Sequence, residues 1–184
     1  MGKVIYGMHT SADGYVEDSG GGFGFLTPAE DVHQAANDQI RRASALLFGR
    51  RLYEMMEEPW TRQLGKEGAP AVEREFAGLY KETPRYVFSD TLQSVPEGCT
   101  LVRREDARST VTRLKQEVDG NLEIGGPELA ASMVDLIDEF WVYAFPVMIG
   151  GGKPFLPVGK ELPLRLVEHR SFASGTMFLR YVRA

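Results

Sequence analysis

Short apolar runs alternate with segments of helical periodicity along most of the chain. An apolar run bounded by a turn or a glycine indicates a buried strand, and apolar residues at every third or fourth position indicate an amphipathic helix. The expected strands cover residues 3–10, 45–49, 85–90, 99–103 and 121–124. The expected helices cover residues 28–43, 50–57, 71–81, 106–118 and 126–137. This alternation predicts an α/β fold, with a mostly parallel sheet and helices on both faces.

The last third of the chain has a different pattern, in which β-rich runs follow one another. These runs cover residues 138–150, 164–172 and 176–184, and Ser174-Gly175 marks a turn between the last two. We expect those two runs to form an antiparallel hairpin that finishes the sheet. No shift in composition marks a boundary, so we expect a single domain over residues 1–184.

Local signals predict the ends of the first two helices. Thr27 is a candidate N-cap, Pro28 suits the first helical position, and Glu30 stands close to where a capping box places an acid. Pro59 is expected to stop the second helix, because proline lacks the N–H that an inner turn needs.

Composition and charge argue against several classes of function. The 184 residues are 43% hydrophobic and carry a net charge of −5, which argues against non-specific binding to nucleic acid. The single cysteine, Cys99, cannot form an intrachain disulfide, and this fits a reducing cytoplasm. The histidines lie far apart and have no metal-ligand spacing, so we expect no metal site. No run approaches the roughly 20 apolar residues of a membrane span.

Three of the predicted strands end on small residues. One ends at Gly125-Gly126 before a helix, another at Gly49 ahead of Arg50, and a third at Ser89. Glycine lets a phosphate approach the backbone, and a helix N-terminus attracts its charge. Parallel strand ends share one edge of a sheet, so these segments could hold a dinucleotide between them. A glycine pair is also often only a tight corner, and the sequence has neither a G-x-G-x-x-G fingerprint nor a Walker pattern.

Five motifs in order connect the chain with a known family: SADG, FGRRLYE, VFSDTL, IGGPELAASMV and DEFWVYAFPVMIGGGKPF. With this set the sequence resembles the dihydrofolate reductase-like superfamily. More narrowly, it is similar to the C-terminal reductase domain of the bifunctional riboflavin-biosynthesis deaminase–reductase. The resemblance implies a three-layer fold around a sheet of about eight strands, parallel except at its C-terminal edge. It also implies NADPH as hydride donor and a homodimer.

The resemblance assigns the cofactor to the three strand ends. Gly49 and Arg50 would meet its phosphates, Ser89 would lie near the adenosine ribose phosphate, and Gly125-Gly126 would pass the pyrophosphate through a non-proline cis peptide bond. The full implied cofactor set is Ser11, Gly14, Gly49, Arg50, Arg51, Ser89, Asp90, Ile124, Gly125, Gly126, Pro127 and Leu129.

Two positions depart from the family pattern. The family commonly has threonine where Leu52 stands, and often a basic residue where Asp90 stands. A carboxylate repels a 2′-phosphate, whereas it accepts a hydrogen bond from a free ribose hydroxyl. NADPH remains the expected donor because Arg50 is present, and NADH is the alternative. Weak or absent cofactor binding is the third possibility.

The candidate catalytic groups are acidic. Reduction of a C=N or C=O group needs a proton donor, and true dihydrofolate reductases carry an acid on the first helix. Glu30 and Asp31 lie on the matching helix, although acids in a first turn also complement the helix dipole. Asp13, with Ser11 and Gly14, would lie beside the nicotinamide or the substrate, although Asp-Gly is also a common turn.

Aromatic side chains could line a pocket for a flat heterocycle, or could equally belong to the core. The candidates are Phe23, Phe25, Trp60 and Phe155. Lys153, in the glycine-rich segment 150–155, could meet an anionic group. The sequence does not identify the substrate.

The sequence therefore predicts a cytoplasmic NAD(P)H-dependent reductase that acts on a small heterocyclic or carbonyl compound. The resemblance is to the riboflavin-biosynthesis type, which implies 5-amino-6-(5-phosphoribosylamino)uracil reductase activity. We expect no nucleic-acid or membrane partner. Two alternatives stay open: a non-catalytic dimeric ligand-binding module on the same fold, and a reductase that binds flavin or deazaflavin.

Overall fold

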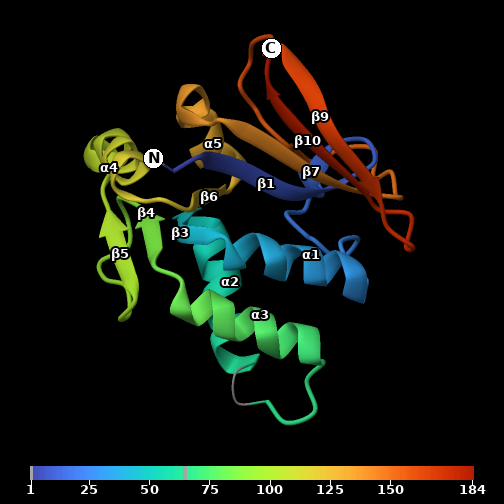
Figure 1. Cartoon of the computed structure of the whole chain (residues 1–184), viewed down its shortest axis with the longest axis horizontal. Helices are drawn as coiled ribbons and strands as arrows, with labels where there is room; N and C mark the ends of the chain where they lie inside the picture. Colours follow the sequence, from blue (N-terminus) through green and yellow to red (C-terminus); the bar gives the residue numbers. More distant parts are fainter. Residues whose placement is uncertain (1, 64–65) are drawn as a thin grey trace.

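The computed structural model describes residues 2–63 and 66–184, and it shows a central sheet with helices on both faces (Figure 1). The helices are α1 (Glu30–Arg41), α2 (Arg50–Gln63), α3 (Ala71–Glu82), α4 (Arg104–Glu117), α5 (Pro127–Ser132) and the 3₁₀ helix η1 (Val134–Leu136). The strands are β1 (Val4–Ser11), β2 (Tyr15–Glu17), β3 (Ala43–Gly49), β4 (Arg85–Phe88), β5 (Cys99–Val102), β6 (Asn121–Gly125), β7 (Glu139–Phe145), β8 (Lys153–Pro154), β9 (Leu164–Ser171) and β10 (Met177–Arg183). Within the described ranges, no helix has the length and apolar character to cross a membrane.

The central sheet has eight strands in the order β5-β4-β3-β6-β1-β7-β10-β9. The strands from β5 to β7 pair in parallel, whereas β10 runs antiparallel to both of its neighbours. The α/β fold, the mostly parallel sheet and the C-terminal hairpin predicted from the sequence are therefore confirmed. Because β10 returns along β7, the edge strand is β9 rather than the last strand of the chain.

Side chains on the strands alternate between two hydrophobic layers. On β3, Leu47 packs in the cluster that includes Val111 of α4, while its neighbour Leu46 packs in the cluster that includes Phe76 of α3. The same alternation turns Glu123 of β6 toward α1, where it is buried. The helices thus cover opposite faces of the sheet, and the carboxyl ends of the parallel strands lie between the two layers.

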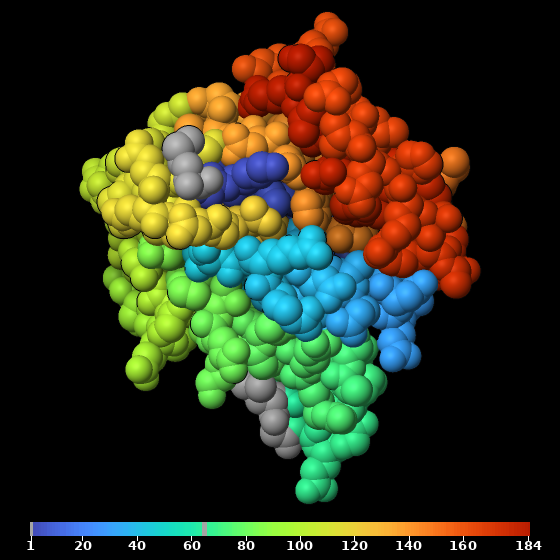
Figure 2. All heavy atoms as spheres, in the orientation of Figure 1, coloured from blue at the N-terminus to red at the C-terminus, as the bar shows by residue number. Residues whose placement is uncertain are grey.

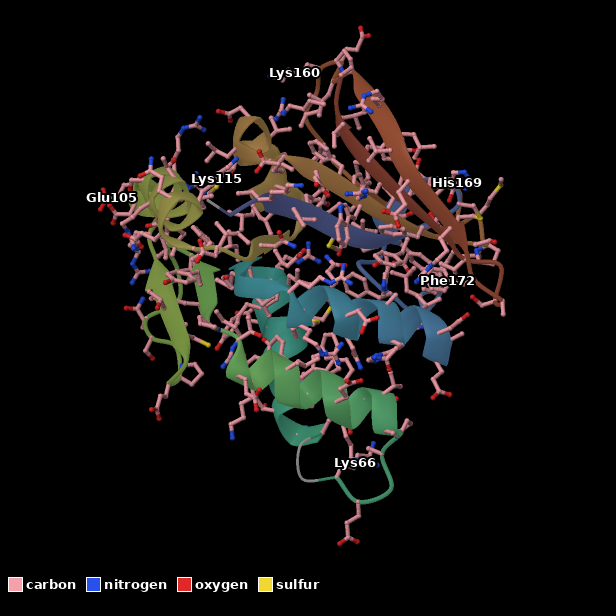
Figure 3. The ribbon with its side chains drawn as sticks, in the orientation of Figure 1. Lys66, Glu105, Lys115, Lys160, His169 and Phe172 are labelled. Atoms are coloured by element: carbon pink, nitrogen blue, oxygen red, sulfur yellow. The ribbon has the colours of Figure 1, made fainter. Side chains whose placement is uncertain are left out.

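A third cluster joins α1 to the C-terminal strands. Val32 of α1 packs with Tyr143 of β7, Phe178 of β10 and Phe172 of the hairpin turn. Figure 3 labels Phe172 near the first residues of α1, where the hairpin approaches that helix.

The first two helices differ from the predicted boundaries. α1 begins at Glu30 with Ala29 as an extended N-cap and no side-chain cap, so the capping box at Thr27 does not form. Leu26 packs against the third cluster, which holds the preceding segment away from helical geometry. α2 continues past Pro59 to Gln63 because Trp60 packs on Phe76, with ring centroids 4.3 Å apart.

The segment predicted as one helix over residues 126–137 is divided. α5 ends at Ser132, and η1 follows after Met133. The Arg183 side chain donates hydrogen bonds to the carbonyl oxygens of Val134 and Ile137, so tertiary contacts bind carbonyl groups that a longer helix would leave at its end. The sequence pattern also missed β2 and β8, which form a small antiparallel ribbon.

Candidate functional site

A cavity of about 760 Å³ opens beyond the carboxyl ends of β4, β3 and β6 and beside Met8 of β1, between α2, α4 and α5. These four strands are neighbours in the order β4, β3, β6 and β1. The cavity therefore crosses three strand spacings, or about 14 Å. Its lining residues are Met8, Val16, Glu17, Phe23, Gly49, Arg50, Arg51, Leu52, Glu54, Met55, Phe88, Ser89, Asp90, Thr91, Arg104, Ala107, Gly126, Pro127, Glu128, Leu129, Ser132, Met133 and Lys153.

The two glycines after β6 serve different purposes. A Cβ on Gly125 would lie 2.4 Å from Leu52 Cδ2 and 3.1 Å from Phe48 Cδ1, so this residue permits close packing of α2 on the sheet. Gly126 has φ +98°, a conformation that other residues rarely adopt. The predicted cis peptide bond is wrong, because no cis bond occurs in residues 2–63 and 66–184. Positive φ at Gly126 makes the turn instead.

The N-terminus of α2 faces the middle of the cavity. The helix starts at Arg50 directly after Gly49, and its first turn contains no acidic residue. Its free N–H groups and partial positive charge are therefore available to an anion. The Arg50 guanidinium also lines the cavity, where it pairs with Glu54 one turn later at 3.1 Å.

We define the outer end of the cavity by Ser89, Asp90, Thr91 and Arg104. The Ser89 hydroxyl oxygen accepts hydrogen bonds from the N–H groups of Thr91 and Leu92, at 3.2 and 3.1 Å. The Asp90 carboxylate accepts one from the Arg104 backbone N–H at 2.9 Å and pairs with its guanidinium Nε at 3.2 Å. Asp90 thereby caps the first turn of α4 and pairs with the arginine that begins it.

We define the inner end of the cavity by Met8, Val16, Glu17, Phe23 and Lys153. The Glu17 side chain is only 7% exposed and lies between two cations. Its carboxylate is 2.9 Å from Arg51 Nη2 and 2.6 Å from Lys153 Nζ.

The same Lys153 ammonium also lies 3.0 Å from Glu128 at the start of α5. Desolvation lowers the pKa of Lys153, but its hydrogen bonds to Glu17 and Glu128 outweigh this and raise the pKa above its ordinary value. Lys153 therefore stays protonated at neutral pH. It can donate a hydrogen bond to a ligand that lies against the apolar side chains of the inner end.

Most of the implied cofactor residues line this cavity. They are Gly49, Arg50, Arg51, Ser89, Asp90, Gly126, Pro127 and Leu129. Ile124 and Gly125 are instead buried behind the lining, where Ile124 belongs to the core. Of the four aromatic candidates only Phe23 reaches the cavity.

The SADG segment holds a turn outside the cavity lining. The Ser11 hydroxyl oxygen accepts a hydrogen bond from the Tyr15 N–H at 3.0 Å, across the turn that contains Gly14. The Asp13 carboxylate accepts bonds from the N–H groups of Ile149 and Gly150, at 3.2 and 2.8 Å. These contacts tie the glycine-rich loop to the end of β1.

The two acids of α1 are also away from the cavity lining. Glu30 is exposed, and Asp31 accepts hydrogen bonds from the N–H groups of Val32 and Ala173, which fixes α1 to the hairpin turn. The structure brings neither carboxylate to the strand ends that hold Gly49.

The remaining aromatic candidates pack elsewhere. Trp60 lies against His33 and Phe76, and Phe155 packs on the core residue Tyr6, with ring centroids 4.6 Å apart. Phe25 belongs to the segment before α1 and does not line the cavity.

The sequence interpretation missed the buried carboxylate of the cavity. Glu17 follows Tyr15 and Val16 in a strand of three residues, which is too short to give a periodic pattern. Its partner Lys153 stands 136 positions later, and only the pairing of β2 with β8 brings them together. The local sequence therefore contained no signal for this ion pair.

The model of the RibD C-terminal domain family matches residues 2–178 of the chain. Among curated proteins, YwjB of Bacillus subtilis is 29% identical over 99% of this chain and 98% of its own length. YyaP of the same organism is 25% identical over 97% of this chain and 94% of its own. Both relatives are described as uncharacterized proteins.

Among the solved structures that share the fold, two bear on the site. The diaminohydroxyphosphoribosylaminopyrimidine deaminase/5-amino-6-(5-phosphoribosylamino)uracil reductase of Thermotoga maritima superposes with a TM-score of 0.71 at 16% identity, over 100% of this chain and 57% of that one. The dihydrofolate reductase of Enterococcus faecalis, complexed with NADP(H), gives a TM-score of 0.68 at 12% identity, over 98% of this chain and 96% of that one.

Proposed function

The chain belongs to the RibD C-terminal domain family, and from this we propose that it is a reductase that passes a hydride from a reduced nicotinamide dinucleotide to a small heterocyclic or carbonyl compound. The observation that carries the proposal is that one cavity spans the ends of β4, β3 and β6 and reaches Met8 of β1. In open parallel sheets, ligands bind outside the carboxyl ends of the strands. The cavity volume also lies within the range of ordinary cofactor sites.

We propose that the dinucleotide lies across the strand ends. Gly49, Arg50 and Gly126 would hold its phosphates, because the α2 N-terminus offers free N–H groups there and no acid occupies its first turn. The outer end would receive the adenosine, and the inner end the nicotinamide. The NADP(H) complex of the Enterococcus faecalis reductase supports NADPH as donor, and NADH is the alternative.

The residues of the inner end suit hydride transfer. The dinucleotide supplies the hydride when bound. Met8, Val16 and Phe23 would exclude water from the reacting atoms. The Lys153 ammonium, fixed by Glu17 and Glu128, would donate a hydrogen bond to the nitrogen or oxygen of the acceptor and supply the proton.

A binding titration tests the proposal. NADPH and NADH are titrated into the protein and followed by their own fluorescence. Arg50→Ala is expected to weaken binding of the preferred dinucleotide at least tenfold, or about 1.4 kcal/mol. Arg113→Ala is the matched control, because Arg113 forms an equivalent ion pair with Glu117 on α4 but does not line the cavity.

The same titration separates the alternatives. If neither dinucleotide binds at millimolar concentration, the reductase proposal fails. Binding of FMN or FAD alone would then favour the flavin reductase. The other alternative is a non-catalytic ligand-binding module on the same fold. Leu52 favours it, since its side chain fills the space beside Gly125 and offers no hydroxyl to a phosphate.

We also propose that the protein is a homodimer that associates through its C-terminal hairpin. β9 is the edge strand, and all but one of its residues are exposed although it pairs with β10. Leu164 and Leu166 are 37% and 45% exposed on it. Figure 2 shows the hairpin residues gathered along one side of the molecular surface.

A further inference from the structure

The cavity contains as many acids as bases. Its lining has four basic residues, Arg50, Arg51, Arg104 and Lys153, and four acidic residues, Glu17, Glu54, Asp90 and Glu128. Every one of the eight takes part in an ion pair with another member of the set, at 2.6 to 3.2 Å. A highly anionic ligand therefore meets a lining without net charge.

The outer end is where the two common dinucleotides differ. NADPH carries an additional phosphate on the adenosine ribose, with a charge of about −1.5 to −2 at neutral pH. A site for this group needs donors that are free to turn toward it. Here the Ser89 hydroxyl is held by two backbone N–H groups and lies 3.3 Å from the Thr91 hydroxyl, and the Arg104 guanidinium, on a side chain that is 90% exposed, turns its Nε to Asp90.

Asp90 occupies the position at the outer end that an anion would take. Its two carboxylate oxygens bind the backbone N–H and the Nε of Arg104, at 2.9 and 3.2 Å. These are two of the donors that the start of the 14-residue helix α4 could otherwise offer to a phosphate. Asp90 is about half exposed, so its charge also faces the cavity.

From these contacts we infer that the outer end selects a dinucleotide with a free 2′-hydroxyl, NADH rather than NADPH, and that Asp90 is the specificity-determining residue. The inference rests on the proposed function. It favours NADH, whereas the complex of the Enterococcus faecalis reductase supports NADPH. The carboxylate accepts a hydrogen bond from the ribose hydroxyl and repels a phosphate in the same place.

Isothermal titration with NADH and NADPH tests the inference. The wild-type protein is expected to bind NADH at least tenfold more tightly than NADPH. Asp90→Asn removes the charge but keeps an oxygen for the Arg104 N–H. This variant is expected to reduce the ratio of NADH affinity to NADPH affinity at least threefold, mainly because it binds NADPH more tightly. Asp119→Asn removes one charge from an exposed position outside the cavity and should leave the ratio unchanged.

A second comparison needs no variant. Adenosine 5′-monophosphate and adenosine 2′,5′-bisphosphate probe the outer end alone, and the monophosphate is expected to bind the wild-type protein more tightly. Equal binding of NADH and NADPH, or a preference for NADPH, would overturn the inference and leave the reductase proposal standing. If Asp90→Asn changes both affinities by the same factor, Asp90 is not the determinant. Failure of both dinucleotides to bind would refute both proposals.

Discussion

At the scale of single residues, Glu123 is a buried carboxyl group with only one of its two oxygens hydrogen-bonded within the described part of the chain. Its Oε2 accepts a hydrogen bond from Gln39 Nε2, and its Oε1 has no partner within the described residues. Burial, and then the charge of Glu139 across β1, raise the pKa of Glu123 to about 8, although the Gln39 hydrogen bond opposes this. The carboxyl group is therefore protonated in the folded protein near neutral pH.

This pKa makes the stability of the protein depend on pH. The carboxyl group titrates near 4.5 in the unfolded chain. The stability that protonated Glu123 contributes is fully present below that value, and it is lost as the pH rises through about 8. Each pKa unit corresponds to about 1.4 kcal/mol.

Glu123→Gln is expected to weaken this pH dependence, because the amide stays neutral. Between about pH 5 and about pH 9, the wild-type protein should lose at least about 1 kcal/mol more of its free energy of unfolding than the variant. Urea unfolding at several pH values measures the difference. Glu161→Gln, at an exposed position, should follow the wild-type curve. Parallel curves for wild type and Glu123→Gln would contradict the assignment.

At the scale of elements, the ribbon of β2 and β8 forms one wall of the cavity. It pairs Glu17 with Lys153, and both side chains line the inner end. Gly152 makes the close approach possible, since a Cβ there would lie 2.0 Å from the Glu17 carbonyl oxygen, and its φ is +143°. A Cβ on the neighbouring Gly151 would meet nothing within 4 Å.

Substituting each of these two adjacent glycines in turn should show whether the close approach at Gly152 matters for stability and for dinucleotide binding. Gly152→Ala is expected to cost about 1–3 kcal/mol of stability, because the backbone of one strand must move. It should also weaken dinucleotide binding, since Glu17 and Lys153 would separate. Gly151→Ala should stay within about 0.5 kcal/mol of the wild type. Thermal unfolding measures the stability of the two variants, and titration measures their dinucleotide binding. Equal effects of the two substitutions would contradict the role given to Gly152.

At the scale of the whole molecule, the C-terminal hairpin leaves an exposed strand at the edge of the sheet. α1 packs on the inner part of β7 and on Phe172 and Phe178. Beyond this contact β9 stays open, and Figure 3 shows its residue His169 on the outer side of the hairpin. An edge strand with exposed leucines is a common surface for association.

Leu166→Lys is expected to turn the proposed dimer into a monomer, because it places a charge in the apolar contact. Sedimentation equilibrium at micromolar concentration would measure the change in mass. Met148→Lys is the control, since Met148 is 78% exposed on a loop outside the hairpin. A wild-type protein that sediments as a monomer would refute the dimer proposal.

The order of strands and helices could be read from the sequence, because side chains near one another in the chain determine it. Leu46 and Leu47 point to opposite faces of β3, and the uninterrupted apolar run that contains them already indicates a strand buried on both faces. Two helix boundaries could not be read in this way. Contacts of Leu26 with the third cluster and of Trp60 with Phe76 outweighed the local signals of Thr27 and Pro59.

The candidate site was likewise predictable from the sequence only in part. The sequence by itself determined that Gly49, Ser89 and the Gly125-Gly126 pair follow strands at one edge of the sheet, because strand ends are a local property and parallel strands share an edge. The tertiary structure made these strands neighbours. The tertiary structure alone decided which charged groups meet there. It turned Glu17 toward Lys153 and Asp90 toward Arg104, and it left Glu30 and Asp31 elsewhere. Ion pairs between distant segments depend on how elements pack, which no local pattern contains.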